Sequence, residues 1–449
     1  MKQHAKPHNE EIDALWEQAL NLHKLSRYDE AQKLYEKLLT IQPHEHAYYN
    51  LGTIFQKEEK LEEAIEMYEK AIALHLNHPN VYYNLGVIFK TQNRLQDAAT
   101  FYEEAIALSP DHANAYTNLG NIRKEQNRLE EAMALYEKAI ALNPNNTNAH
   151  LNKSLILLAR GELLEGFALY EKRRPVRSFS KPAWTGAESL EGKTLLIYSE
   201  QGFGDTIQFC RYIERVAKLG CTVIFEVPKP LLPLMRQLNG VSCFVEKGEA
   251  LSSFDLHCSL LSLPFAFQTT LESIPSKQSY LTADPQKVAD WQKLFHGTKP
   301  KVGLVWSGSE TNKGDVYRSI PLEKLLASLP EDFECICLQK EVRQRDQNVL
   351  ENSSIRFLGE SLHDFSDTAA LCSLMDFVVS VDTSVAHLSA ALGKKTVVLL
   401  PFAPDWRWLL ERSDSPWYPT IQLLRQDAME DWESVLQKLN QILLNFEKQ

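Results

Sequence analysis

The sequence predicts an array of helical repeats followed by a body of two doubly wound α/β halves. Short motifs recur every 34 residues through the first third of the chain, and strand-like apolar runs alternate with helical patterns from Lys193 onward. The stretch Ser380–His387 joins a β-branched strand to a helix through good capping residues. Because open α/β sheets bind ligands beyond the carboxyl ends of their strands, we expect the site in this second part.

Composition indicates an intracellular protein of two or three domains. The chain has 449 residues, 44% of them hydrophobic, and a formal net charge of -11. That charge argues against nucleic acid as a partner and against anionic membranes. Seven scattered cysteines suit reduced core thiols, and no run is apolar and long enough to span a bilayer. We therefore expect cytoplasmic localisation without membrane insertion.

Four columns define the repeat. They are Asn-Leu-Gly at 50–52, 84–86 and 118–120, alanine at 64, 98 and 132, tyrosine at 68, 102 and 136, and alanine at 71, 105 and 139. Small residues where two helices touch, with aromatics between them, resemble the tetratricopeptide repeat. The resemblance covers about residues 11–172. It implies roughly five helix pairs stacked as a solenoid with a concave binding surface.

One column of this array has a polar side chain in each equivalent helix: Asn50, Asn84, Asn118 and Asn152. An amide both donates and accepts, so it can pair with the backbone of an extended peptide of any sequence. A similar asparagine ladder binds the acceptor peptide in O-linked N-acetylglucosamine transferases. The column therefore predicts acceptor binding, although asparagine at this position also occurs in repeats without that role.

The segment after the array breaks its periodicity. Residues 171–182 contain five basic residues and two prolines. We interpret residues 173–192 as an extended, solvated linker, with phosphate binding as the alternative.

Two α/β halves follow the linker. In the first, strands at 194–199 and 222–226 flank a loop, 200–206, and a helix. In the second, strands at 302–306, 334–338, 377–381 and 396–400 alternate with helices. We place the lobes at residues 193–296 and 297–449. Gly202-Phe203-Gly204 lacks the third glycine of a dinucleotide loop and no Walker A motif occurs, so hydride transfer and nucleotide hydrolysis lose support.

Three motifs in this body resemble one family. Gly-x-Gly-Asp ends at Asp205, a glycine loop follows the strand at 302–306, and Asp-Thr-x-x-x-His runs from Asp382 to His387. Together they resemble glycosyltransferase family nine, the ADP-heptose-dependent heptosyltransferases, over about residues 193–445. The resemblance implies a GT-B fold of two Rossmann-like lobes, with the acceptor on the first lobe and the nucleotide-sugar donor on the second. It also implies that an amphipathic helix at about 429–446 closes the second lobe onto the first.

The resemblance assigns roles to individual residues. Asp205 corresponds to the family's general base, although an aspartate here also suits a helix N-cap. Asp382, Thr383, Ser384 and His387 correspond to the motif that holds the donor diphosphate and sugar. Serine replaces the family's glycine at position 384, which leaves the identity of the donor open.

The diphosphate leaving group requires further positive charge. We rank Lys340 and Arg318 above Lys313 for this role. The remaining predicted donor residues lie in loops after the strands: Gly202, Gly204, Ser307, Gly308 and Gln339. No Asp-x-Asp motif is present, so we expect no metal and no cofactor besides the nucleotide-sugar, with an ADP-linked sugar as one option. Tryptophans at 406, 408 and 417 either stack on the ligand or pack the lobes.

The sequence thus favours a metal-independent inverting glycosyltransferase that acts on a protein or peptide acceptor presented by the repeats. One alternative is an interaction scaffold whose body binds nucleotide-sugars without turnover. Another is transfer to a glycan or lipid. Homo-oligomerisation is left open.

Overall fold

The computed structural model describes residues 10–310 and 314–446. The chain separates into two compact units, one ending at Asn152 and the other beginning at Lys153. Each unit is described by itself.

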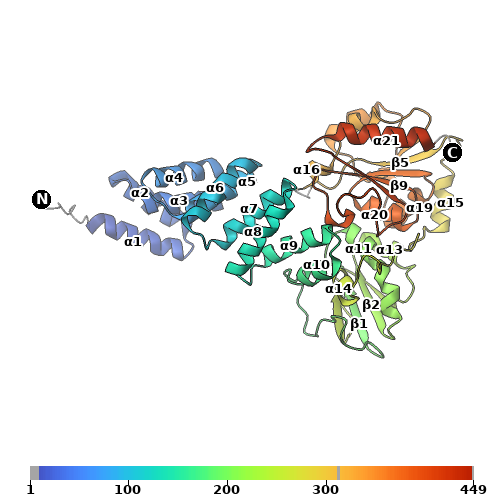
Figure 1. Ribbon diagram of the computed structural model, residues 1–449, viewed down its shortest axis with the longest axis horizontal. Helices are drawn as coiled ribbons and strands as arrows, with labels where there is room; N and C mark the ends of the chain where they lie inside the picture. Colours follow the sequence, from blue (N-terminus) through green and yellow to red (C-terminus); the bar gives the residue numbers. More distant parts are fainter. Residues whose placement is uncertain (1–9, 311–313, 447–449) are drawn as a thin grey trace. The chain divides into compact units, whose positions relative to one another are not determined.

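The first unit consists of antiparallel helix pairs (Figure 1). Its helices are α1 (Glu10–Lys24), α2 (Tyr28–Ile41), α3 (Glu45–Lys57), α4 (Leu61–Ala73), α5 (Pro79–Thr91), α6 (Leu95–Leu108), α7 (Ala113–Glu125), α8 (Leu129–Leu142) and the first half of α9 (Thr147–Ala159). Three of the tight turns within a pair place Glu59, Asn93 or Asn127 at φ near +60°. Asparagine tolerates this left-handed conformation better than most residues, which suits these turns.

The recurring glycine and tyrosine of the repeat form one packing unit. A Cβ atom added to Gly52, Gly86 or Gly120 would lie 2.6 Å from a ring carbon of the tyrosine sixteen residues later. Those rings, at positions 68, 102 and 136, are completely buried. Glycine is therefore required because the tyrosine ring occupies the space of its side chain. The predicted tetratricopeptide solenoid is confirmed as a helical array.

The second unit begins with the end of α9 and with α10 (Leu163–Tyr170), and its first lobe contains a four-stranded parallel sheet in the order β3-β2-β1-β4. The strands are β1 (Thr194–Tyr198), β2 (Thr222–Val227), β3 (Cys243–Glu246) and β4 (Leu256–Ser259). The main helical segments are α11 (Phe203–Phe209), η1 (Cys210–Tyr212), α12 (Ile213–Ala217), η2 (Lys229–Leu231), α13 (Leu232–Met235), η3 (Leu260–Ser262) and α14 (Leu263–Ala266). Helix α15 (Pro285–Gln292) leads to the second lobe.

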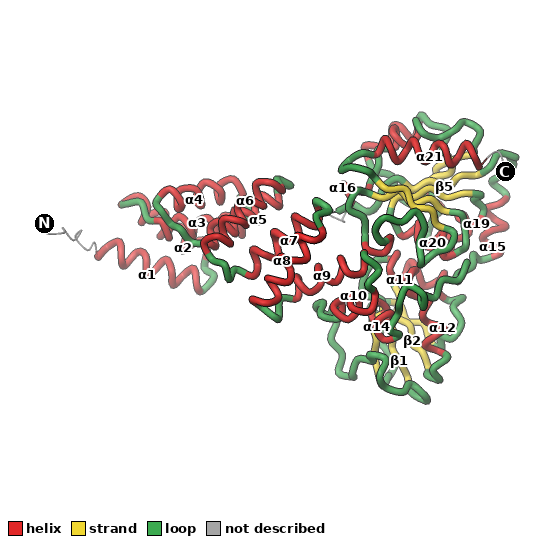
Figure 2. Tube along the Cα trace, viewed as in Figure 1, coloured by secondary structure: helices red, strands yellow, loops and turns green. Residues whose placement is uncertain are grey.

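The second lobe contains a six-stranded parallel sheet in the order β10-β9-β8-β5-β6-β7 (Figure 2). Its strands are β5 (Lys301–Val305), β6 (Glu334–Cys337), β7 (Arg356–Phe357), β8 (Phe377–Val381), β9 (Thr396–Leu400) and β10 (Ile421–Arg425). Its helices are α16 (Asp315–Arg318), α17 (Leu322–Leu326), α18 (Gln344–Glu351), η4 (Gly359–Ser361), α19 (Phe365–Ser373), α20 (Ser384–Ala391), η5 (Trp406–Trp408) and α21 (Trp432–Phe446). The central strands β8 and β9 are buried along their whole length, which explains their nearly continuous apolar sequences.

The last helix corrects one expectation. Val435, Leu439 and Leu443 of α21 belong to the same core cluster as Val302 and Val379 of the second sheet. The helix therefore packs on its own lobe, because its apolar stripe completes that lobe's core.

Most of the segment 173–192 is exposed, as predicted for a solvated linker, but Arg173 and Trp184 are tied to the first lobe. The Arg173 side chain, 11% exposed, donates to Glu171, Glu200 and Ser262 at 2.7–2.9 Å. Trp184 is buried, and its backbone N–H donates to the carbonyl of His257 in β4. Arg173 and Trp184 therefore belong to the first lobe, because the guanidinium group finds its hydrogen-bond partners there and the indole ring is buried there.

Candidate active site

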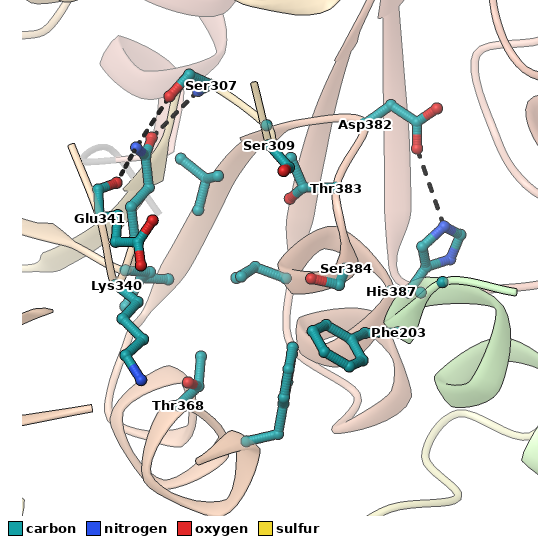
Figure 3. A pocket seen from close by; sticks show the side chains of 18 of the residues that line it. Phe203, Ser307, Ser309, Lys340, Glu341, Thr368, Asp382, Thr383, Ser384 and His387 are labelled. Atoms are coloured by element: carbon teal, nitrogen blue, oxygen red, sulfur yellow. Dashed lines mark hydrogen bonds and ion pairs between the residues drawn. The ribbon is translucent and has the colours of Figure 1, made fainter. Parts of the chain in front are cut away.

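A cavity of about 1010 Å³ lies in the second unit, where the carboxyl ends of the strands of both sheets meet. Its wall comes from the start of α11, the loops after β5 and β6, the start of α20, and the loop before η5. Figure 3 shows Ser307, Lys340, Ser384 and His387 around this space. The topology therefore brings motifs that are up to 200 residues apart in the sequence to one place.

Asp205 is the third residue of α11 and lines the cavity. Its Oδ2 accepts the backbone N–H of Gly202 at 2.9 Å, and its Oδ1 accepts from the Arg407 guanidinium of the second lobe. Burial raises the pKa of Asp205, while Arg407 acts in the opposite direction. Gly202, not Asp205, is the N-cap residue of α11, and Asp205 closes the helix end from the third helical position. Its carboxylate also faces the cavity, where the role of general base stays a prediction.

Gly204 lines the cavity and also has a packing role that the sequence analysis did not predict. A Cβ atom on it would lie 2.9 Å from Cδ2 of His387 and 3.5 Å from Cα of Ser384. The glycine is therefore needed for the close approach of α11 and α20.

The N-terminus of α20 is open toward the cavity. Thr383 is its N-cap residue, but the Thr383 hydroxyl lies 3.1 Å from the Ser380 hydroxyl and does not cap the helix. Within residues 10–310 and 314–446, the N–H groups of Ser384 and Val385 have no acceptor in the protein. Open N–H groups at the positive end of a helix dipole are suited to binding an anion.

His387 is buried beside this helix end. Its Nδ1 lies 2.9 Å from the Tyr418 hydroxyl, and its Nε2 lies 3.9 Å from Asp382 Oδ1. Burial and Arg407 lower the pKa of His387 to about 3. Burial and Asp405 raise the pKa of Asp382 to about 6. At neutral pH the imidazole is therefore uncharged and the Asp382 carboxyl is mostly ionised.

Arg318 is held in place rather than free in solvent. Its Nε donates to Asp315 at 2.8 Å and its Nη1 donates to the Asp382 carbonyl at 2.7 Å. Arg343, which the sequence analysis missed, also pairs with the buried Asp315. A Cβ atom on Gly308 would collide with Asp315 and Arg318, so this glycine makes room for the cluster. Two guanidinium groups are thereby fixed at the cavity wall.

The other predicted donor residues differ in what they contact. The Gln339 amide accepts from the N–H groups of Trp306 and Ser307 and donates to the Ser307 hydroxyl, so it shapes the loop after β5. Lys340 is exposed and lines the cavity, where Figure 3 shows its chain running toward Thr368. Gly202 also lines the cavity. Lys313 lies outside the described residues.

The asparagine column is partly used within the array itself. The amide nitrogens of Asn50, Asn84 and Asn118 donate to the hydroxyls of Tyr35, Tyr68 and Tyr102 at 2.9–3.3 Å. Asn152 departs from this pattern: its oxygen accepts from Lys124, and its nitrogen donates to a backbone carbonyl.

This pairing narrows what the column can bind. Among the described residues, the side-chain oxygens of Asn50, Asn84 and Asn118 have no protein donor. The first three members therefore offer acceptors, rather than the donor–acceptor pairs that the sequence suggested.

Arg407 and Asp405 are the main residues that sequence reasoning missed. Arg407 donates to Asp405 at 2.7 Å as well as to Asp205. Although burial opposes it, Arg407 holds the pKa of Asp405 below its usual value. The only signal in the sequence was a charged pair inside a tryptophan-rich segment. Its tryptophans at 406, 408 and 417 are buried and pack the lobes, which decides between the two interpretations in favour of packing.

Two observations concern metals and membranes. In the described part of the chain, one group of side chains has ligand atoms close enough to share a metal ion: His44, Glu45 and His46, in the first unit. No helix within residues 10–310 and 314–446 has the length and apolar character needed to cross a membrane.

Comparisons with known families agree with the two predicted parts. Tetratricopeptide repeat models match residues 10–75, 44–111, 113–146 and 135–166, and the model of glycosyltransferase family 9 (heptosyltransferase) matches residues 336–405. The chain therefore combines N-terminal tetratricopeptide repeats with a glycosyltransferase family 9 region. That region contains Gln339, Lys340 and the Asp382–His387 motif, whereas Asp205 and Arg407 lie outside it.

Individual proteins and solved structures share only 21–25% of their aligned residues with this chain. Protein FlbA of Caulobacter vibrioides is 25% identical over 295 residues, which are 59% of this chain and 48% of that protein, so the match spans about half of the relative. Among solved structures, MamA (24% identity, 34% of this chain and 91% of that one, TM-score 0.32) and PilF of Pseudomonas aeruginosa (24%, 38% and 80%, 0.35) are similar. So is YrrB, described as a TPR protein with an unusual peptide-binding site (21%, 34% and 80%, 0.31).

Proposed function

We propose that this chain is an inverting GT-B glycosyltransferase that moves a sugar from a nucleotide-sugar to a protein or peptide acceptor. One observation carries the proposal. A carboxylate at the end of one parallel sheet and an open helix N-terminus at the end of the other face the same cavity, in a body that includes the family 9 match. The arrangement supplies a base on one side and an anion site on the other.

In the proposed reaction Asp205 accepts the proton of the acceptor's nucleophilic group. Each of its oxygens accepts one hydrogen bond from the protein, and a carboxylate oxygen has room for a second. The acceptor atom forms the new bond to the anomeric carbon as the bond from that carbon to the phosphate oxygen breaks on the opposite face. The proton goes to Asp205 and the electron pair of the broken bond leaves with the nucleoside diphosphate.

The charge of the leaving group is met by groups of the second lobe. The N–H groups of Ser384 and Val385 point into the cavity from α20, and Arg318 stands on the wall with its guanidinium already oriented. Preorganised donors of this kind stabilise developing negative charge without a metal. We therefore expect a chelator such as EDTA to leave turnover unchanged.

The first lobe and the array would receive the acceptor. The acceptor-type oxygens of Asn50, Asn84 and Asn118 suit the backbone N–H groups of an extended peptide. Replacing all three by alanine should lower transfer to a protein acceptor and leave hydrolysis of the donor by water unchanged.

The experiment measures release of nucleoside diphosphate from ADP-, UDP-, GDP- and dTDP-linked sugars by the full-length chain, with and without EDTA. Release from donors of one base, abolished in Asp205→Asn, supports the proposal. If no donor is turned over but one nucleoside diphosphate raises the melting temperature, the body binds nucleotides without catalysis and the scaffold alternative holds.

A further inference from the structure

The His387 ring is fixed on every side. It stacks on Trp408 with ring centroids 5.1 Å apart and planes 18° from parallel, and Gly204 lies against its Cδ2 edge. The Tyr418 hydroxyl is 2.9 Å from Nδ1. Figure 3 shows the other ring nitrogen directed toward Asp382. No rotation of the ring is available, so the position of its proton decides what it offers to a ligand.

The surroundings determine that proton position. Nε2 lies 3.9 Å from a carboxylate oxygen of Asp382, and both residues line the cavity. A nitrogen lone pair facing a carboxylate is repelled, whereas an N–H is attracted, so Asp382 favours the proton on Nε2, and the hydrogen bond at Nδ1 is the second determinant. Nδ1 must then accept a hydrogen bond, and the Tyr418 hydroxyl is the donor within reach.

The neighbouring tyrosine does not donate to Tyr418. The Tyr280 hydroxyl donates to the Ile207 carbonyl at 3.0 Å and accepts from Arg211 at 2.9 Å, so its own proton is already committed. Tyr418 is completely buried in the same cluster, and burial raises its pKa well above the usual value, so it keeps its proton. Its O–H is thus present at any ordinary pH, and its two possible acceptors are His387 Nδ1 and the Tyr280 hydroxyl.

We propose that Tyr418 is a positioning residue that holds His387 as the neutral Nε2–H tautomer, which donates a hydrogen bond to the phosphate or sugar of the nucleotide-sugar. This inference rests on the proposed function for the identity of the ligand. The tautomer itself is a property of the free protein.

The charges around the ring are consistent with a neutral imidazole. Arg407, Arg211 and Arg318 act against its protonation, while Asp405 and Asp382 favour it. Burial and the guanidinium groups outweigh the carboxylates, so the pKa of His387 falls to about 3. His387 therefore acts as a hydrogen-bond donor and not as an acid or base near neutral pH.

The test is ¹⁵N NMR of histidine-labelled, full-length protein, with His387 assigned through His387→Ala. The wild type should show the His387 proton on Nε2 and no protonation of the imidazole between pH 5.5 and 8.5, a range that includes the unperturbed histidine pKa of about 6.5. In Tyr418→Phe, which keeps a ring but removes the hydroxyl, the resonance should show a mixture of tautomers. A wild-type proton on Nδ1, or an unchanged tautomer in Tyr418→Phe, would overturn the proposal.

Tyr280→Phe is the matched control, because it removes a hydroxyl from the same cluster without touching His387. It should leave the Nε2–H tautomer in place. If Tyr280→Phe shifts the proton, the Tyr418 hydroxyl donates to Tyr280 instead and the proposal is wrong. Circular dichroism and the melting temperature of both variants establish that they fold.

A second readout separates this inference from the proposed function. The nucleoside diphosphate that stabilises the wild type should bind Tyr418→Phe about two- to tenfold more weakly, the usual effect of one misdirected neutral hydrogen bond. An Nε2–H tautomer in a wild type that binds no nucleotide would contradict the proposed function and leave the tautomer assignment standing. Nucleotide binding with equal affinity in wild type and Tyr418→Phe would overturn the ligand role of His387.

Discussion

Strand β1 leads into α11 and strand β8 leads into α20, so two similar strand–loop–helix units deliver their helix N-termini to one cavity. In α11 the third residue, Asp205, folds back onto the Gly202 N–H and places a negative charge at the helix end. In α20 no side chain among the described residues caps the end, and the N–H groups of Ser384 and Val385 are open. The same local fold thus yields a carboxylate at one helix end and open N–H groups at the other.

The difference arises from a few side chains. After β1, the aspartate lies inside helix α11, where its carboxylate reaches back to the N-cap residue. After β8, the aspartate, Asp382, precedes the N-cap residue of α20, and its carboxylate faces His387. A shift of the acidic residue along the same motif therefore changes the charge that the helix presents.

The largest effect is expected from Asp205→Asn. The amide cannot accept a proton from the acceptor, so turnover should fall by about a thousandfold or more. Affinity for the nucleoside diphosphate should change little, because the anion site lies on α20. Steady-state kinetics and a thermal-shift titration on the same preparation measure both quantities. A loss of binding equal to the loss of turnover would remove the distinction between the two helix ends.

Arg407→Met should have the next largest effect. Arg407 lowers the pKa of Asp205 and burial raises it, so removing the guanidinium raises that pKa further. The acidic limb of the profile of kcat/KM against pH should move to higher pH, and turnover should suffer most at low pH. The unfolding free energy should fall by about 3–5 kcal/mol, since two carboxylates lose their partner.

Arg407→Lys serves as the control for this variant. It keeps the charge but cannot bridge both Asp205 and Asp405 with a planar fork, so it should show a smaller shift of the pH profile. Asp405 and Tyr170 also face Asp205 electrostatically and are unchanged in both variants. A pH profile identical to that of the wild type in Arg407→Met would contradict the assigned coupling.

Ser384→Pro tests the anion site more gently. Thr383 has extended backbone angles, φ -138° and ψ 172°, which suit the residue before a proline, and the first helical position tolerates proline. The substitution therefore removes one open N–H while the helix is kept. We expect about tenfold weaker binding of the nucleoside diphosphate. Ser384→Ala, which keeps the N–H and loses only the hydroxyl, should bind much as the wild type does.

Asp382→Asn tests how the raised pKa of Asp382 affects stability. The pKa of Asp382 in the folded protein, about 6, lies above its unperturbed value of 3.8, so the folded state binds more protons between these values. The unfolding free energy of the wild type should accordingly fall as pH rises from about 4 to 6, by about 3 kcal/mol at most. The variant should lack this decline and be more stable at pH 7. Urea unfolding at pH 4, 5, 6 and 7 measures it, and a parallel decline in both proteins would refute the assignment.

The sequence predicted the parts of the fold whose causes are local. The 34-residue repeat could be predicted because each repeat needs a glycine packed against the same tyrosine. The strand, cap and helix in Ser380–His387 could be predicted because capping residues directly follow a buried strand. The expected cleft between two α/β lobes also placed Asp205 and His387 near each other, since each follows the carboxyl end of a strand in its own lobe.

The contacts that could not be predicted span the two lobes or depend on side-chain direction. Arg407 reaches Asp205 from 202 residues away, and nothing near it in sequence marks that partner. Arg173 looked like a solvated linker charge because Glu200 and Ser262 become its neighbours only on folding. The asparagine amides looked free because the hydroxyls that bind them belong to tyrosines about sixteen residues earlier on another helix.

The most direct test compares Asp205→Asn and Ser384→Pro in one experiment, with nucleoside diphosphate binding and turnover of the preferred donor both measured. If the two helix ends have separate roles, Asp205→Asn binds like the wild type but does not turn over. Ser384→Pro then binds the nucleoside diphosphate about tenfold more weakly, and it still turns over the donor when the donor is saturating. If Asp205→Asn loses binding, or Ser384→Pro binds normally, the division of base and anion site between α11 and α20 is wrong.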